Sequence, residues 1–87
     1  MKGEGALVAI PDLFLPLPRY PFHGYYLETK RPGEYPTAAQ RDMHERLRRR
    51  GYKVDVWRSV EEGLELLIRY RALPTWGQVI TSDSRHL

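Results

Sequence analysis

The chain has 87 residues, a length that fits one small domain with a thin hydrophobic core. It contains no cysteine, which excludes disulfides and a thiolate zinc site, and its 41% hydrophobic and 29% charged residues are typical of a folded domain. The net charge of +3 and the sequence pI near 9.4 modestly favour an anionic partner.

The sequence also lacks the usual membrane signals. No apolar run approaches the ~20 residues that a membrane span requires. The N-terminus lacks the basic and then apolar layout of a signal peptide. We therefore expect a cytoplasmic protein without a membrane partner.

The N-terminal third predicts two strands joined by a proline-rich connection. Residues 6–15 are expected to form a strand that is interrupted at Pro11. Three prolines within residues 16–22 forbid regular structure in the connection. The second strand is expected over residues 24–30.

This hairpin brings acidic and basic groups together. If it folds symmetrically about Tyr20, paired residues have numbers that sum to about 40, which places Asp12 opposite Glu28. Because alternate strand residues share a face, Glu28, Lys30 and Tyr26 point to the same side. Two opposed carboxylates repel each other and normally require a cation. The alternative is a turn aspartate and an exposed Glu28–Lys30 salt bridge worth under ~1 kcal/mol.

After a turn over residues 31–35, the next segment predicts a helix. Thr37 is the expected N-cap, and Gly51 the expected C′ residue that follows a basic last turn. Apolar residues recur every four positions and predict one narrow buried stripe, formed by Ala39, Met43 and Leu47.

A third strand is predicted over residues 52–58. Val54 and Val56 occupy one face of it, and Trp57 occupies the other. An indole at that position needs cover, either from the core or from another subunit.

The last clear element is a helix that begins with a capping box of Ser59 and Glu62. Its expected packing face consists of Val60, Leu64, Leu67 and Ile68. Residues 74–87 show no strong period, so a short strand, a docking segment and a loose tail all remain open. The predicted organisation is a domain over residues 1–73 and a tail over 74–87. Its fold is α/β, with the order β-β-α-β-α and a small mixed sheet.

Several short motifs occur in a recognisable order. They are Ile10-Pro11-Asp12-Leu13, Glu28-Thr29-Lys30, Pro32-Gly33, Gln40, Leu47, Gly51, Val54-Asp55-Val56 and Ser59-Val60-Glu61-Glu62. Between residues 6 and 68 this combination resembles a VRR-NUC domain, a family of the PD-(D/E)xK nuclease superfamily. The resemblance implies a minimal restriction-endonuclease-like core. Members of the family usually begin with a helix that carries a glutamate, and we expect that helix to be missing, because only ten residues precede Pro11.

The resemblance also implies an activity, namely metal-dependent cleavage of DNA phosphodiester bonds. Asp12 and Glu28 would be carboxylate ligands of Mg²⁺ or Mn²⁺, and the main-chain carbonyl of Thr29 would also face the metal. Lys30 would be the catalytic lysine, and Gln40 the helix-borne polar partner of the site. Small stand-alone members are similar to Holliday-junction resolvases of phages and bacteria, which implies branched DNA as substrate and a homodimer.

Basic residues around the first helix suggest contacts with nucleic-acid phosphates. The candidates are Arg31, Arg41, His44, Arg48 and Lys53. His44 also lies one turn after Gln40, so both side chains can project towards the same site. The alternative for the basic residues is a solvated helix face, and for His44 an ordinary surface histidine. The three histidines have no metal-ligand spacing, which argues against a zinc enzyme.

Two further functions compete with a nuclease. One is a non-catalytic DNA-binding or assembly module that keeps the fold, which the expected absence of the first helix favours. The other is an interaction fragment of a larger protein. Salt-sensitive DNA binding without metal-dependent cleavage would indicate the first, and absence of DNA affinity the second.

Overall fold

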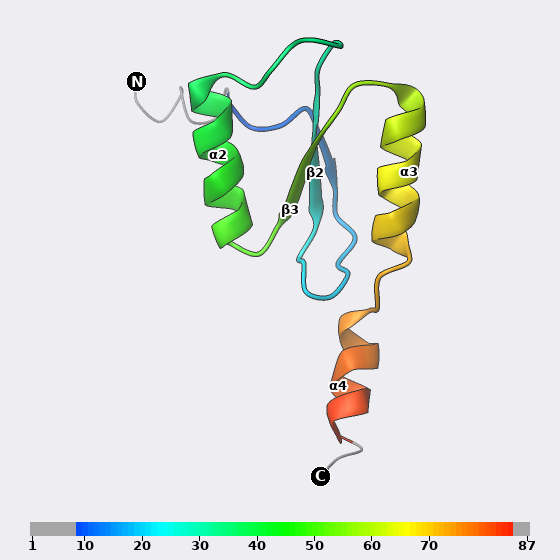
Figure 1. Cartoon of the computed structure of the whole chain (residues 1–87). Coiled ribbons are helices and arrows are strands. Elements are labelled where there is room, and N and C mark those ends of the chain that lie inside the picture. Colours follow the sequence, from blue (N-terminus) through cyan, green and yellow to red (C-terminus); the bar gives the residue numbers. More distant parts are fainter. Residues whose placement is uncertain (1–8, 85–87) are drawn as a thin grey trace.

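The computed structural model describes residues 9–84, which form a three-stranded sheet with helices on both faces (Figure 1). In chain order the elements are β1 (Leu13–Leu15), β2 (Tyr25–Thr29), α2 (Ala38–Arg49), β3 (Lys53–Trp57), α3 (Val60–Arg71) and α4 (Trp76–Ser84). The predicted β-β-α-β-α order and the small mixed sheet are confirmed, and α4 follows them.

The strand order is β1-β2-β3, and the predicted hairpin register is correct. β1 and β2 are antiparallel with Leu13 opposite Leu27, so paired residue numbers sum to 40. β3 lies parallel to β2 and is reached through α2, the usual crossover between parallel strands. The first strand is shorter than predicted. Residues 9–12 stay outside the ladder, where Pro11 has no N–H to donate, and residues 6–8 lie outside the described part of the chain.

The core lies between the sheet and α3. Tyr25, Leu27 and Tyr70 form its buried centre, and Trp57 packs against them. Trp57 therefore has the intrachain cover that the sequence left open between the core and another subunit. The Tyr25 hydroxyl donates to Asp55 at 2.6 Å, which satisfies this buried polar group.

Helix α2 begins and ends as the sequence predicts, but its inner face differs. Thr37 is the N-cap, and Gly51 has the positive φ of 91° expected at a C′ position. Ala39 is exposed, whereas His44 is buried and Met43 and Leu47 are half-buried. The helix is thus rotated about its axis relative to the predicted orientation. The spacing of apolar residues could not predict this rotation, because the inner face includes polar groups that bond to the sheet.

The predicted packing face of α3 is wrong for three of its four residues. Val60, Leu64 and Ile68 are 68%, 54% and 68% exposed, and only Leu67 is partly covered. The inner face is instead centred on Gly63 and Tyr70, because Gly63 allows the helix to approach Trp57 closely.

The start of α3 also differs in detail. Ser59 accepts from the Glu62 N–H as predicted, but the Glu62 carboxylate accepts from the Arg58 N–H rather than from Ser59. The second half of the capping box is thus displaced by one residue.

The segment after Leu73 forms a helix, which was not among the structures considered from the sequence. Thr75 and Gln78 cap α4 reciprocally, with N–H···O distances of 2.7 and 3.1 Å. In Figure 1 α4 projects from the hairpin end of the sheet. Within residues 9–84, no helix is long and apolar enough to cross a bilayer.

Candidate active site

Two carboxylates meet where β1 begins and β2 ends. Asp12 directly precedes β1, and the register of the hairpin continued by one residue places it opposite Glu28. The two side chains are within hydrogen-bonding reach of each other. The pairing predicted from the sequence is therefore present, and it lies at the end of the sheet that carries the N-termini of α2 and α3 (Figure 1).

Thr29 fixes the Asp12 carboxylate. Its backbone N–H and its hydroxyl both donate to Asp12 Oδ2, at 3.0 and 2.5 Å. The Thr29 hydroxyl, then its N–H, lower the pKa of Asp12, and a hydrogen bond with Glu28 and the charge of Lys30 add to this effect. Asp12 is thus held as an anion. The hydroxyl contact was not predicted, because the family resemblance points only to the main-chain carbonyl of Thr29.

Glu28 is a buried carboxylate, with only 2% of its surface exposed. Burial raises its pKa, and the neighbouring charge of Asp12 raises it further, while the hydrogen bond with His44 opposes these effects. A desolvated carboxylate beside a second anion is an unfavourable arrangement without a compensating cation. This pair therefore fits a cation site better than a structural ion pair.

Helix α2 holds both oxygens of Glu28. His44 Nε2 lies 3.3 Å from Glu28 Oε1, and Gln40 Nε2 donates to Oε2 at 3.5 Å. The expectation that Gln40 and His44 face the same site is met geometrically. His44 is only 3% exposed, so the structure places it against Glu28 rather than on a surface that faces nucleic acid.

A capping box fixes the orientation of Gln40. Thr37 Oγ1 accepts from the Gln40 N–H at 3.1 Å, and Gln40 Oε1 accepts from the Thr37 N–H at 2.9 Å. With its oxygen engaged in the cap, the amide presents its nitrogen to Glu28. The start of α2 thereby both begins the helix and positions a group in the site.

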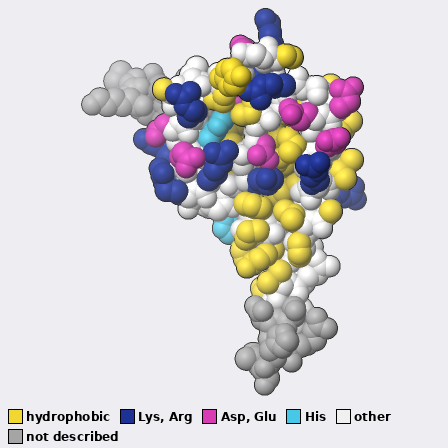
Figure 2. Space-filling model, in the orientation of Figure 1, with side chains coloured by type: hydrophobic (Ala, Val, Ile, Leu, Met, Phe, Trp, Pro, Cys, Tyr) yellow, Lys and Arg dark blue, Asp and Glu magenta, His cyan; other side chains and the backbone are white. Residues whose placement is uncertain are grey.

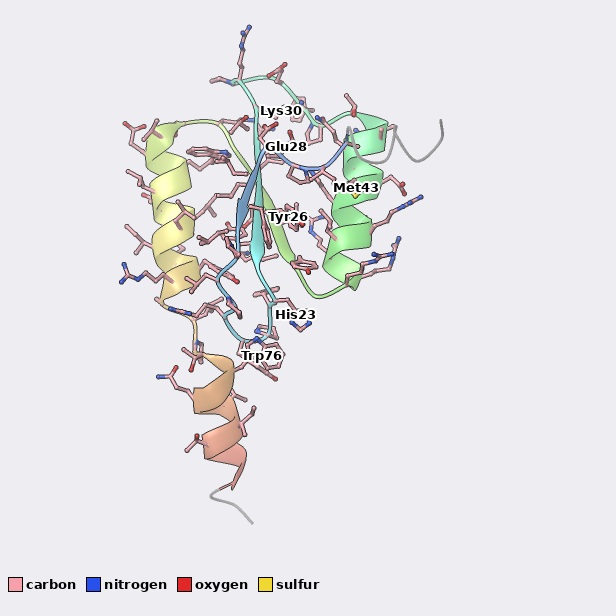
Figure 3. All side chains as sticks on the ribbon, turned by 180° about the vertical axis from the view of Figure 1, so that it is seen from behind. His23, Tyr26, Glu28, Lys30, Met43 and Trp76 are labelled. Atoms are coloured by element: carbon pink, nitrogen blue, oxygen red, sulfur yellow. The ribbon has the colours of Figure 1, made fainter. Side chains whose placement is uncertain are left out.

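Lys30 follows the last residue of β2, is half-buried, and lies next to Glu28 at this end of the strand (Figure 3). Its N–H donates to the Trp57 carbonyl at 3.0 Å, which fixes its backbone to β3. Because its charge lowers the pKa of Asp12, the ammonium group acts on the carboxylate side of the site. Lys30 thus lies near Asp12 and Glu28 at this end of the sheet, and its catalytic role stays a prediction.

The donor set fits a hard divalent ion held by few protein ligands. Mg²⁺ prefers oxygen ligands, keeps several waters and is usually bound by one or two carboxylates. Asp12 and Glu28 provide this minimum. Within residues 9–84, no three His, Cys, Asp or Glu side chains gather to form a complete metal cage. Water and substrate oxygens would therefore have to complete the coordination.

The predicted nucleic-acid contacts divide into two groups. Arg31 and Arg41 lie at the active-site end, where the Arg41 guanidinium donates to the Pro36 carbonyl at 2.7 Å. Arg48 is tied to Glu45 and to the Val54 carbonyl near the far end of α2. Lys53 begins β3, opposite Tyr25, and pairs with Asp55 at 3.0 Å. The structure thus does not bring Arg48 and Lys53 to the carboxylates.

Arg58 was missed from the sequence. The parallel register pairs Thr29 with Trp57, so the next residues, Lys30 and Arg58, emerge side by side. The Arg58 guanidinium donates to the Glu34 carbonyl at 2.9 Å and lies over the Tyr35 ring. Both cations line a pocket together with Thr29, Trp57, Ser59 and Val60. Predicting that Arg58 lies beside Lys30 would have required knowing that β3 pairs with β2 and runs parallel to it.

Comparison with solved structures gives an informative match. No family model and no curated protein matches the chain. A solved structure described as a VRR_NUC domain protein superimposes with a TM-score of 0.77 at 28% sequence identity, over 85% of this chain and 62% of that one. The chain thus spans about three fifths of the length of that protein.

Proposed function

We propose that this chain, which belongs to the VRR-NUC family, is a metal-dependent nuclease that hydrolyses DNA phosphodiester bonds. The observation that carries the proposal is the buried Glu28 carboxylate, held by α2 and turned towards Asp12 with Lys30 beside them. This combination has no evident structural benefit, and it provides the groups that phosphodiester hydrolysis requires.

Each residue has a role that follows from its position. Asp12 and Glu28 would hold Mg²⁺ or Mn²⁺, with the Thr29 carbonyl as a further ligand. Such an ion, when bound, polarises the scissile phosphate and lowers the pKa of a coordinated water. Thr29 keeps Asp12 ionised, and Gln40 and His44 orient Glu28. Lys30 would offset the charge that develops on the phosphate while the leaving oxygen departs.

The DNA backbone would approach over the cations at this end of the sheet. Arg31, Arg41 and Arg58 belong to the segments at this end of the sheet, where β2 and β3 end and α2 begins. Figure 2 shows further Lys and Arg side chains gathered over α2. Branched DNA, and a four-way junction in particular, follows from the family resemblance alone.

Replacing Lys30 with alanine tests the nuclease directly. Loss of one group that stabilises developing charge typically costs about 10²–10³ in rate, and we expect a loss of that order. The assay follows cleavage of a labelled four-way junction and of a matched linear duplex in Mg²⁺, Mn²⁺ and EDTA.

Lys53→Ala is the matched control, because Lys53 lies at the opposite end of the sheet. Its cleavage rate should stay within about threefold of the wild-type rate, since this substitution removes at most one salt-dependent contact with the DNA phosphate backbone. A folded wild type that binds DNA but never cuts it would reject the nuclease and support the non-catalytic binding module.

A homodimer is the assembly that the exposed face of α3 favours. Val60, Leu64 and Ile68 lie four residues apart on one line of the helix, and each is more than half exposed. Such a stripe can bury itself against the same stripe of a second copy around a two-fold axis. The two active sites would then be related by symmetry.

We expect Leu64→Glu to convert the dimer to a monomer, because it places a charge at the centre of the α3 stripe. Sedimentation of wild type and variant at micromolar concentration measures this change. Glu65→Gln is the control, since Glu65 is exposed and its ion pair with Arg69 on the same helix is long, at 3.8 Å. A wild type that sediments as a monomer would exclude the dimer.

A further inference from the structure

A continuous row of rings extends along the sheet from the candidate active site. We call it the aromatic row, and its members are Phe14, Tyr20, His23, Tyr26, Tyr52 and Trp76. In Figure 3 the labelled residues Lys30, Glu28, Tyr26, His23 and Trp76 follow one another from the active-site end of β2 to the start of α4. The mechanism above uses none of these six rings.

The half of the row nearest to the site lies on the sheet. Phe14 of β1 stacks on Tyr26 of β2 with ring centroids 4.5 Å apart, and Tyr26 meets the edge of Tyr52 at 5.4 Å. Phe14 lies on β1, which is an edge strand of the sheet in the described part of the chain, and the residue is 46% exposed. Phe14 thus offers an exposed surface beside the half-buried rings of Tyr26 and Tyr52.

The other half lies at the hairpin end. His23 is parallel to the Trp76 indole, with an interplanar angle of 4° and a centroid distance of 5.6 Å. Tyr20 meets Trp76 edge-on at 4.9 Å and is 38% exposed. Figure 2 shows hydrophobic side chains gathered at this end of the sheet and at the start of α4.

Two glycines make room for rings of the row. A Cβ at Gly24 would lie 2.8 Å from the Phe14 ring, and one at Gly51 would lie 2.5 Å from the His23 ring. Gly51 is also required at the end of α2 by its positive φ, but Gly24 has no such backbone reason. The rings are therefore seated closely on the backbone rather than loosely on the surface.

The row is directly continuous with the acidic pair. Asp12 and Phe14 are two residues apart on one side of β1, a separation of about 7 Å along a strand. Tyr26 likewise precedes Glu28 by two residues on the same face of β2. A strand of nucleic acid that leaves the carboxylates along β1 would meet Phe14 first.

The charges around the row are basic. Residues 13–27 contain one charged side chain, Arg19, and residues 46–54 contain five basic residues and no acidic one. The side chains of Arg49 and Arg50, next to Gly51, are exposed and form no hydrogen bond or ion pair with the described residues. The acidic residues next to this stretch of chain, Glu45 and Asp55, form ion pairs with Arg48 and Lys53, which leaves Arg49 and Arg50 available to an anionic ligand. Aromatic surface beside such cations is the combination that binds unpaired nucleotides.

We infer that the aromatic row stacks the unpaired bases of a single-stranded segment that leads away from the active site. This inference rests on the proposed nuclease function and specifies its substrate class, a nucleic acid with an unpaired arm. Phe14 and Tyr20 provide exposed ring surface for the bases, and Arg49 and Arg50 contact the phosphates between them.

The test measures binding separately from cutting. A labelled single-stranded oligonucleotide and a duplex of the same length are titrated with the full chain in EDTA, with fluorescence anisotropy as the readout. Loss of one base–aromatic stack typically costs about 5- to 150-fold in affinity, and we expect a roughly tenfold loss for Phe14→Leu and for Tyr20→Leu. Duplex affinity should change by less than about twofold.

Leu13→Ala is the control, because Leu13 is as exposed as Phe14, at 47% against 46%, but faces the other side of β1 and lies outside the α3 stripe. Unchanged single-strand binding by Phe14→Leu and Tyr20→Leu would overturn the inference, as would equal losses for single strand and duplex. A change of oligomeric state instead of affinity would show that the row contacts a second copy of the chain, which would also overturn it. The double variant Arg49→Gln, Arg50→Gln removes the proposed phosphate contacts without changing the packing of the rings. It should weaken single-strand binding at least threefold.

The experiment also separates this inference from the nuclease proposal. Glu28→Gln should stop cleavage and keep the single-strand preference. A wild type that prefers single strands in EDTA but never cuts would reject the nuclease and leave the stacking surface in place. A wild type that cuts duplex but shows no preference for single strands would support the nuclease and reject the stacking surface.

Discussion

Replacing Glu28 with glutamine is expected to abolish metal-dependent cleavage while the domain remains folded. The substitution keeps the shape of the side chain and its contacts with Gln40 and His44 but removes one of two anionic ligands. We expect the cleavage rate to fall by at least about a thousandfold, because the ion that the pair would hold provides both the polarised phosphate and the activated water. Initial rates on the labelled junction in Mg²⁺ and Mn²⁺ measure the effect.

The same variant should change how stability depends on pH. The pKa of Glu28 is raised above its ordinary value of 4.5 because the carboxyl is buried and faces Asp12. The folded state therefore binds this proton more tightly than the unfolded chain does. Raising the pH from about 4.5 through the folded-state pKa ionises Glu28 and lowers the free energy of unfolding. Glutamine cannot ionise, so the variant should lack this decline.

Urea unfolding between pH 4 and pH 8 without divalent ions, and again with Mg²⁺ or Mn²⁺, tests this directly. The ion should restore stability to the wild type near pH 7 and leave Glu28→Gln unchanged. Asp12 acts in a different window, because its lowered pKa makes its contribution disappear only as the pH falls below about 3.8. Parallel stability curves for wild type and variant would show that Glu28 carries no burial cost and would remove the main argument for a cation site.

The hairpin chemistry could be predicted from the sequence because strand geometry is local. Alternation and a symmetric turn suffice to place Asp12 opposite Glu28, and the register confirms it. A helix period likewise predicts that Gln40 and His44 share a face. Their hydrogen bonds to Glu28 could not be predicted, because the orientation of α2 over the sheet depends on packing between distant segments.

The errors have the same origin. Hydrophobic spacing predicted that Val60, Leu64 and Ile68 face the core, yet the inner face of α3 is set by Gly63 against Trp57. A residue without a side chain leaves no trace in a hydrophobic pattern, although it determines how closely the helix approaches. Arg58 was missed because its proximity to Lys30 depends on the parallel pairing of β2 with β3.

Gly63→Ala should destabilise the domain, although alanine is the better helix former. A Cβ at this position would overlap the Trp57 indole, with Cε3 and Cζ3 as the nearest atoms. The indole cannot withdraw, because it packs against the core residues Tyr25, Leu27 and Tyr70. Overpacking costs about 1–3 kcal/mol and occasionally more. We take about 3 kcal/mol here and subtract the ~1 kcal/mol that alanine gains over glycine in a helix.

The expected net loss of about 2 kcal/mol corresponds to a fall in Tm of about 10 °C for a domain of this size. Gly77→Ala is the matched control, because among the described residues a Cβ there meets only Thr75 Oγ1, at 3.9 Å. The helix preference should therefore act alone and stabilise by up to ~1 kcal/mol. Changes of opposite sign in the free energy of unfolding for the same substitution in two helices would locate the effect at the Trp57 contact.

A second variant tests the contact directly. Trp57→Leu should relieve the clash, so that Gly63→Ala costs less in that background. An equal cost in both backgrounds would mean that the approach of α3 to the sheet is not limited at this point.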